Sequence, residues 1–144
     1  MAKLGASAGW SGQMAETLTG AKTFSKRDGG KVFYVTTTST FANTLPKCSE
    51  AGAGWEMTVV AACNIAADIT FTSAQNSDGV YGNIPIAADA AGFSSASSAN
   101  DQVKFKSNST QGDMVHFMTD GNDWYVHGQA AGGTSMSFEG TLSG

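Results

Sequence analysis

Short runs of alternating apolar and polar residues recur along the chain from residue 31 onward. In DITFTS (68–73), Ile69 and Phe71 alternate with polar residues. A period of two places successive side chains on opposite faces of a strand, so such runs predict half-buried β-strands. The same reasoning predicts strands in GWEMTVVAAC (54–63), DQVKFKS (101–107) and SMSFEGTL (135–142).

The stretches between these runs predict further strands and their connections. KVFYVTTTST (31–40) is dense in the β-branched and aromatic residues that favour strands. NIAAD (64–68) predicts a hairpin loop that joins the strands on either side of it. Segment 73–101 consists mostly of small and polar residues and predicts a long loop. A loop of this length usually has a function, or its conformation depends on assembly with a partner. Only VYGNIPI within it predicts a strand, and Pro85 would restrict that strand to a sheet edge.

Residues 112–129, GDMVHFMTDGNDWYVHGQ, predict a β-hairpin that turns at Gly121 and Asn122. In this register Phe117 pairs with Val126, and His116 pairs with His127. One face of the hairpin is then a core face, formed by Val115, Phe117, Trp124 and Val126. The other face carries Met114, His116, Met118, Tyr125, His127 and Gln129.

Residues 1–22 follow neither a period of two nor a clear helical period. Trp10, Met14 and Leu18 are spaced by four, as on one helical stripe, but several glycines weaken a helix here. We expect an irregular N-terminal arm (1–22) with at most a short helix, followed by one β-rich domain (23–144). The predicted fold class is all-β, a compact antiparallel β-sandwich or barrel-like module.

The amino-acid composition argues against several classes of function. Charged residues make up 14% of the 144 residues and the net charge is −4, which argues against nucleic-acid binding. No run of eighteen apolar residues predicts a membrane span, and the first twenty residues lack the apolar stretch of a secretory signal. Cys48 and Cys63 do not form a disulfide framework. They favour buried free thiols, and their spacing is also compatible with one bridge.

Signals for catalysis or metal binding are weak. His116 and His127 would be cross-strand neighbours with Cβ atoms roughly 5 Å apart. A zinc site needs three or four ligands, and the hairpin supplies no third one. GASAG (5–9) matches a nucleophile-elbow pattern without the strand that must precede it. DGND lacks the carboxylate count of a calcium loop. We therefore predict no catalytic residue, no metal and no cofactor.

Two groups of residues are predicted to meet a partner protein. Methionine and aromatic residues are enriched in the buried centres of protein interfaces. Such residues occupy the face of the hairpin that lies opposite its core face. The interface candidates are Met114, His116, Met118, Tyr125 and His127 in the hairpin, with Trp10, Met14 and Leu18 in the arm.

Several stretches together resemble a known class of protein. DGGKVFYVTTTSTFANTLP, AGAGWEMTVV, ITFTSA, DQVKF and GDMVHFMTDGNDWYVHGQ follow one another across about residues 28–128. In this order they resemble small head decoration (cement) proteins and related virion proteins of tailed bacteriophages. The DGxxWYV hairpin is the most distinctive part, and it is shared with tail-fibre proteins. The two histidines and the Ala-rich stretch 87–99 depart from the family pattern.

The resemblance implies a non-enzymatic all-β module. It implies binding to the major capsid protein on the outer surface of the phage head, commonly as a homotrimer, and stabilisation of the shell. The protein would be made in the host cytoplasm and reside in the virion. Alternatives are a tail or fibre component, a carbohydrate-binding β-sandwich with exposed tryptophans, or an enzyme that depends on His116.

Overall fold

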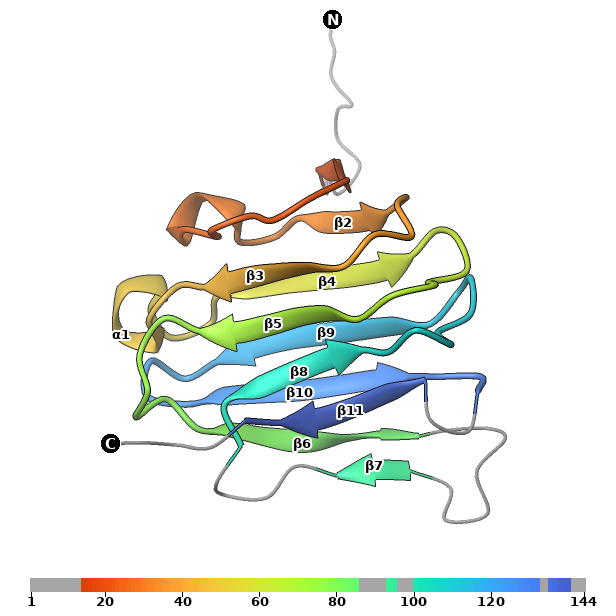
Figure 1. The fold of residues 1–144 in the computed structure, drawn as a ribbon. Coiled ribbons are helices and arrows are strands. Elements are labelled where there is room, and N and C mark those ends of the chain that lie inside the picture. Colours follow the sequence, from red (N-terminus) through yellow and green to blue (C-terminus); the bar gives the residue numbers. More distant parts are fainter. Residues whose placement is uncertain (1–13, 86–92, 96–99, 133–134, 141–144) are drawn as a thin grey trace, which may run out of the picture.

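The computed structural model describes residues 14–85, 93–95, 100–132 and 135–140, with residues 93–95 described through their backbone alone. Strands dominate this part of the chain and form two sheets (Figure 1). The seven-stranded sheet has the order β1 (Ala15–Leu18), β2 (Val32–Val35), β4 (Glu56–Ala61), β9 (Met114–Thr119), β10 (Trp124–Gln129), β6 (Val80–Pro85) and β7 (Phe93–Ser95). The four-stranded sheet has the order β11 (Met136–Glu139), β8 (Gln102–Phe105), β5 (Ile69–Ser73) and β3 (Phe41–Leu45). Two short helical turns are η1 (Lys26–Asp28) and α1 (Cys48–Ala51).

The two sheets face each other across one apolar core (Figure 1). Phe71 of β5 and Phe117 of β9 meet between the sheets, with ring centroids 5.5 Å apart. Phe24 and Phe33 form an edge-to-face pair with centroids 4.9 Å apart. The buried residues follow the alternation seen in the sequence, since each strand directs every second side chain into the core. Alternation along the strands predicts core positions at Trp55, Phe71, Phe105, Phe117, Trp124 and Val126, and all six are buried, which confirms this prediction.

The all-β fold class is confirmed, but the expectation of antiparallel pairing is wrong in part because both sheets are mixed. Among the described strands, β1 with β2, β2 with β4, β6 with β10 and β3 with β5 are parallel pairs. A parallel pair needs a crossover between its strands, which no local turn signal reveals. The chain makes these crossovers by passing from one sheet to the other.

The predicted hairpin over residues 64–68 is wrong for the same reason. β4 belongs to the seven-stranded sheet and β5 to the four-stranded sheet, so residues 62–68 bridge the two layers. Ile65 is buried in this bridge, and its N–H donates to the carbonyl oxygen of Ser109 (2.8 Å). An apolar residue in the connection thus anchors it to the core, where a hairpin loop would have exposed it.

The expectation of an edge strand around Pro85 is also wrong. β6 lies between β10 and β7, and Pro85 stands at its last position, opposite Phe93. Gly82 permits the close parallel pairing of β6 with β10. Its φ is +140°, and a Cβ atom there would lie 1.9 Å from the carbonyl oxygen of Val126. Only glycine fits that position without a shift of the backbone.

The N-terminal arm, expected to be irregular with at most a short helix, forms the parallel strand β1 at Ala15–Leu18, within the part that the structure describes. Leu18 is buried in the core. Glu16 joins a cluster of charges in which Lys31 contacts both Glu16 and Asp28, and Lys22 lies 3.5 Å from Asp28. Two carboxylates thus match two ammonium groups, which secures β1 to the start of β2.

Small polar and charged side chains cover the outward surface of the four-stranded sheet. Lys104 Nζ lies 2.7 Å from Glu139 Oε2 across β8 and β11, and Lys106 Nζ lies 3.4 Å from Glu139 Oε1. The hydrogen bond from Lys104, assisted by one from Ser137, lowers the pKa of Glu139 from 4.5 to about 2. This surface has the paired charges that are typical of a solvated β-sheet.

Replacing Phe117 by Ala is expected to destabilise the protein by about 3–5 kcal/mol, the usual cost of truncating a core aromatic residue. Phe117 is fully buried and contacts Phe71 and Trp124 across the core. Chemical denaturation of both proteins measures the difference. A change below about 1 kcal/mol would show that the position is not a packed core site.

Replacing Glu139 by Gln is expected to reduce the loss of unfolding free energy that occurs as the pH falls into the acid range. Because the folded-state pKa of Glu139 is depressed, its stabilisation is present above about pH 4.5 and is lost as the pH falls towards about 2. Denaturation at a series of pH values checks this. Glu50→Gln is a matched control, since Glu50 is exposed and pairs with the exposed Lys47. Equal acid sensitivity of wild type and Glu139→Gln would contradict the assignment.

Candidate functional site

The outward surface of the seven-stranded sheet collects aromatic, methionine and histidine side chains. We call this surface the outer face and define it by Tyr34, Glu56, Thr58, Tyr81, Asn83, Met114, His116, Met118, Tyr125, His127 and Gln129. These positions alternate with buried residues along their strands, so they lie on the side opposite the core. Tyr34 and Tyr125 are two of the most exposed large apolar side chains in the described part of the chain, at 40% and 39%.

Strand register arranges the outer face in rows that cross the sheet. One row runs from Thr58 through His116 and His127 to Asn83. A second row runs from Glu56 through Met118 and Tyr125 to Tyr81. The rings of Tyr81 and Tyr125 stack with centroids 6.2 Å apart. The rows therefore form one continuous surface over β4, β9, β10 and β6.

The β9–β10 hairpin has the predicted register. His127 pairs with His116 and Val126 pairs with Phe117, which confirms that prediction. The turn is fixed by Asp120, whose Oδ1 accepts the N–H groups of Asn122 (2.9 Å) and Asp123 (3.0 Å). These backbone hydrogen bonds, that of Asp123 first, lower the pKa of the Asp120 carboxyl. Gly121 supplies the positive φ of +97° that the turn requires.

The side chain of Tyr125 is held at the turn. Its hydroxyl donates to Asp120 Oδ2 at 3.2 Å, and this hydrogen bond, together with the negative charge of Asp120, raises the pKa of Tyr125. A fixed aromatic ring loses little conformational entropy when a partner covers it, which suits it to an interface.

His116 has two partners on β4 that sequence reasoning missed. Its Nδ1 lies 2.9 Å from Thr58 Oγ1, and its Nε2 lies 3.6 Å from Glu56 Oε2. Alternation along residues 54–63 places Glu56 and Thr58 on the outward side of their strand, but nothing local indicates that β4 pairs with β9. The hydrogen bond with Thr58 holds the imidazole of His116 towards β4.

The described part of the outer face does not assemble the ligands of a metal site. Within the described ranges, no group of three or more His, Cys, Asp or Glu side chains is placed to hold a metal ion. His116 and His127 pair as neighbours, and Glu56 adds one carboxylate on the far side of His116. The contacts of His116 with Thr58 and Glu56 therefore fix the position of its side chain on the outer face.

The other predicted interface residues divide into three outcomes. Met14 precedes β1 and is 61% exposed. Leu18 is buried in the core of its own chain at 3% exposure, so its side chain packs inward in the single chain. Trp10 lies outside the described residues.

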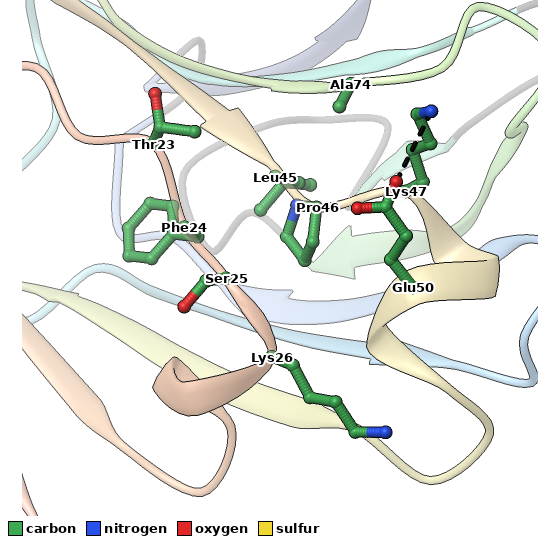
Figure 2. A pocket seen from close by; sticks show the side chains of 9 residues that line it. All are labelled: Thr23, Phe24, Ser25, Lys26, Leu45, Pro46, Lys47, Glu50 and Ala74. Carbon is green, nitrogen blue, oxygen red and sulfur yellow. Dashed lines mark ion pairs between the residues drawn. The ribbon is translucent and has the colours of Figure 1, made fainter.

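A surface pocket of about 310 Å³ lies beside α1, away from the outer face (Figure 2). Phe24, Leu45 and Pro46 form its buried floor. Lys47 and Glu50 stand on one side and pair with each other, with Nζ 3.3 Å from Oε2. The lining residues include neither histidine nor cysteine, and the Ser25 hydroxyl donates to the Asp28 carboxylate (3.3 Å).

The two cysteines are free in the structure, Cys48 buried and Cys63 half-buried. The N–H of Cys48 donates to Asp78 Oδ2 at 2.8 Å. Burial raises the pKa of the Cys48 thiol to about 12, so it is held in the unreactive protonated form. Cys63 lies 3.8 Å from the carbonyl oxygens of Val35 and Thr37. The cysteines thus behave as packing residues.

Comparison of the sequence with protein-family models gives no matching family, and comparison with curated proteins gives no similar sequence. In the described part of the chain, the helices are too short to cross a membrane.

Native protein treated with iodoacetamide near pH 8 is expected to leave Cys48 unmodified. A thiol with a pKa of about 12 exposes little thiolate, and its side chain is shielded from the reagent. Peptide mass spectrometry after short exposure measures the label at each cysteine, with unfolded protein as the control. Rapid labelling of Cys48 in the native state would contradict its inert role.

Proposed function

We propose that this protein is a structural component of a bacteriophage virion, a decoration protein that binds the outer surface of the head and stabilises it. The protein is made in the host cytoplasm and binds the major capsid protein without catalysing a reaction. In this proposal the two facing sheets constitute a β-sandwich, a compact module suited to repeated display on a shell. The resemblance of residues 28–128 to such proteins supports the assignment.

The observation that carries the proposal is the composition of the outer face. Of its eleven positions, Glu56 alone carries a fixed charge, and His116 lies beside that carboxylate. The opposite surface, on the four-stranded sheet, has Lys104, Lys106 and Glu139 in ion pairs. Interface centres are depleted of charge and enriched in Tyr and Met, so the outer face is the side that suits contact with the shell.

The alternative functions have less support. A carbohydrate platform needs exposed tryptophans, but Trp55 and Trp124 are 6% and 0% exposed and pack edge-to-face against each other. An enzyme centred on His116 needs a substrate cleft, whereas His116 and its neighbours Thr58 and Glu56 lie on the outward surface of a sheet. A tail or fibre component would use the same outer face on a different part of the virion.

Imaging of virions purified from the source tests the position in the particle. The proposal expects repeated density of this mass on the outer surface of the head. Density confined to the tail would favour the fibre assignment, and particles that lack this protein entirely would reject a virion function.

Substitutions on the outer face are expected to weaken binding to particles stripped of this protein. Tyr34→Glu and His127→Glu each place a charge where a partner would desolvate it, which should reduce affinity at least about tenfold in co-sedimentation. Ala42→Glu is the matched control, because Ala42 is exposed on the four-stranded sheet. Wild-type binding by both outer-face variants would contradict the assignment of the docking side.

A further inference from the structure

Strand β1 leaves backbone groups directed away from the sheet. It ends the seven-stranded sheet, and among the described strands it pairs with β2 alone. The N–H of Val32 donates to the carbonyl oxygen of Met14 (2.9 Å), and the N–H of Thr36 donates to that of Leu18 (3.3 Å). Alternate residues of a strand bond to opposite sides, so Ala15 and Thr17 direct their N–H and C=O groups to the free edge.

The other sheet ends in the described part of the chain are covered. Residues 22–24 run along β3, where the N–H of Phe24 donates to Thr44 O (2.8 Å) and the N–H of Thr44 donates to Lys22 O (3.0 Å). β7 and β11, which end the two sheets on the other side, lie against each other. β1 also lacks the lysine or proline with which natural edge strands block pairing.

We propose that β1 is a self-association edge, where β1 of a second copy of this chain pairs with it in antiparallel orientation. A two-fold axis beside Glu16 would relate the copies, which is the commonest symmetry of soluble oligomers. Ala15 of each copy then exchanges two backbone hydrogen bonds with Thr17 of the other copy. Met14 lies opposite Leu18 of the second copy in the same register.

The side chains around β1 fit this register. Met14 is 61% exposed, although its position has the same strand parity as the buried Leu18. Pairing would place Met14 beside Leu18 of the other copy and would cover this exposed side chain. The two Glu16 residues would approach each other, but each already lies beside Lys22 (3.7 Å) and Lys31, so their repulsion is compensated.

Pairing through β1 would extend one sheet across both copies. The two-fold axis of an antiparallel pair stands perpendicular to the sheet, so both outer faces would lie on the same side. If both outer faces contact the same partner surface, binding of the first raises the effective concentration of the second, so two weak contacts act together. The self-association itself does not depend on the proposed virion function.

A proline substitution in β1 tests the pairing of the two copies. Thr17→Pro removes an outward N–H and leaves the hydrogen bonds between β1 and β2 intact, whereas Thr17→Val is a matched control that keeps the N–H. Sedimentation analysis over roughly 1–200 µM covers the range in which micromolar contacts become populated. We expect wild type and Thr17→Val to reach twice the 14.8 kDa mass of the chain, and Thr17→Pro to remain at that mass.

A second variant protects the test against misfolding of the proline variant. Met14→Glu alters a side chain that is exposed in the single chain, and it should weaken the dimer at least about tenfold. Circular dichroism and thermal unfolding establish that each variant is folded. A monomeric wild type, a trimer of the kind the family resemblance implies, or a dimer that survives both substitutions would overturn the proposal. Particle binding by a monomeric wild type would overturn this inference and leave the proposed function standing.

Discussion

The contact between the inner faces of the two sheets, centred on Phe71 and Phe117, constrains the other parts of the molecule. Each strand must direct alternate apolar side chains into this contact, because no other large apolar cluster exists in the described part of the chain. The remaining side chains of every strand are thereby forced outward. The residues on each outward surface are then free to serve solubility or binding. The four-stranded sheet carries ion pairs on its outward surface, whereas the outer face carries mostly uncharged side chains.

The fold class and the hairpin could be predicted because their signals are local. A period of two identifies a strand and its buried face, and the DGND turn fixes which residues of β9 and β10 pair. The pairing of His116 with His127 follows from that turn alone. The core positions of β4, β5 and β8 follow from alternation in the same way.

Contacts between strands distant in sequence could not be predicted from local pattern. The pairing of β4 with β9 brings Glu56 and Thr58 to His116, across 60 and 58 residues of chain respectively. The parallel position of β6 beside β10 depends on the close approach at Gly82, and β1 is held by Leu18 and the charges around Glu16. Such arrangements are decided by three-dimensional packing, so segments 1–22 and 73–101 looked irregular in the sequence.

The central claim is that the outer face is the surface covered by a partner, and hydroxyl-radical footprinting of particle-bound protein tests it most directly. Methionine, tyrosine and histidine side chains react readily with the radical, and Tyr34, Met114, Tyr125 and His127 report from four points of the outer face. The account predicts that their oxidation falls on binding to particles, whereas that of Phe138, which is half-buried against the core in the four-stranded sheet, is unchanged. Unchanged oxidation of the outer face in the bound protein would contradict the account.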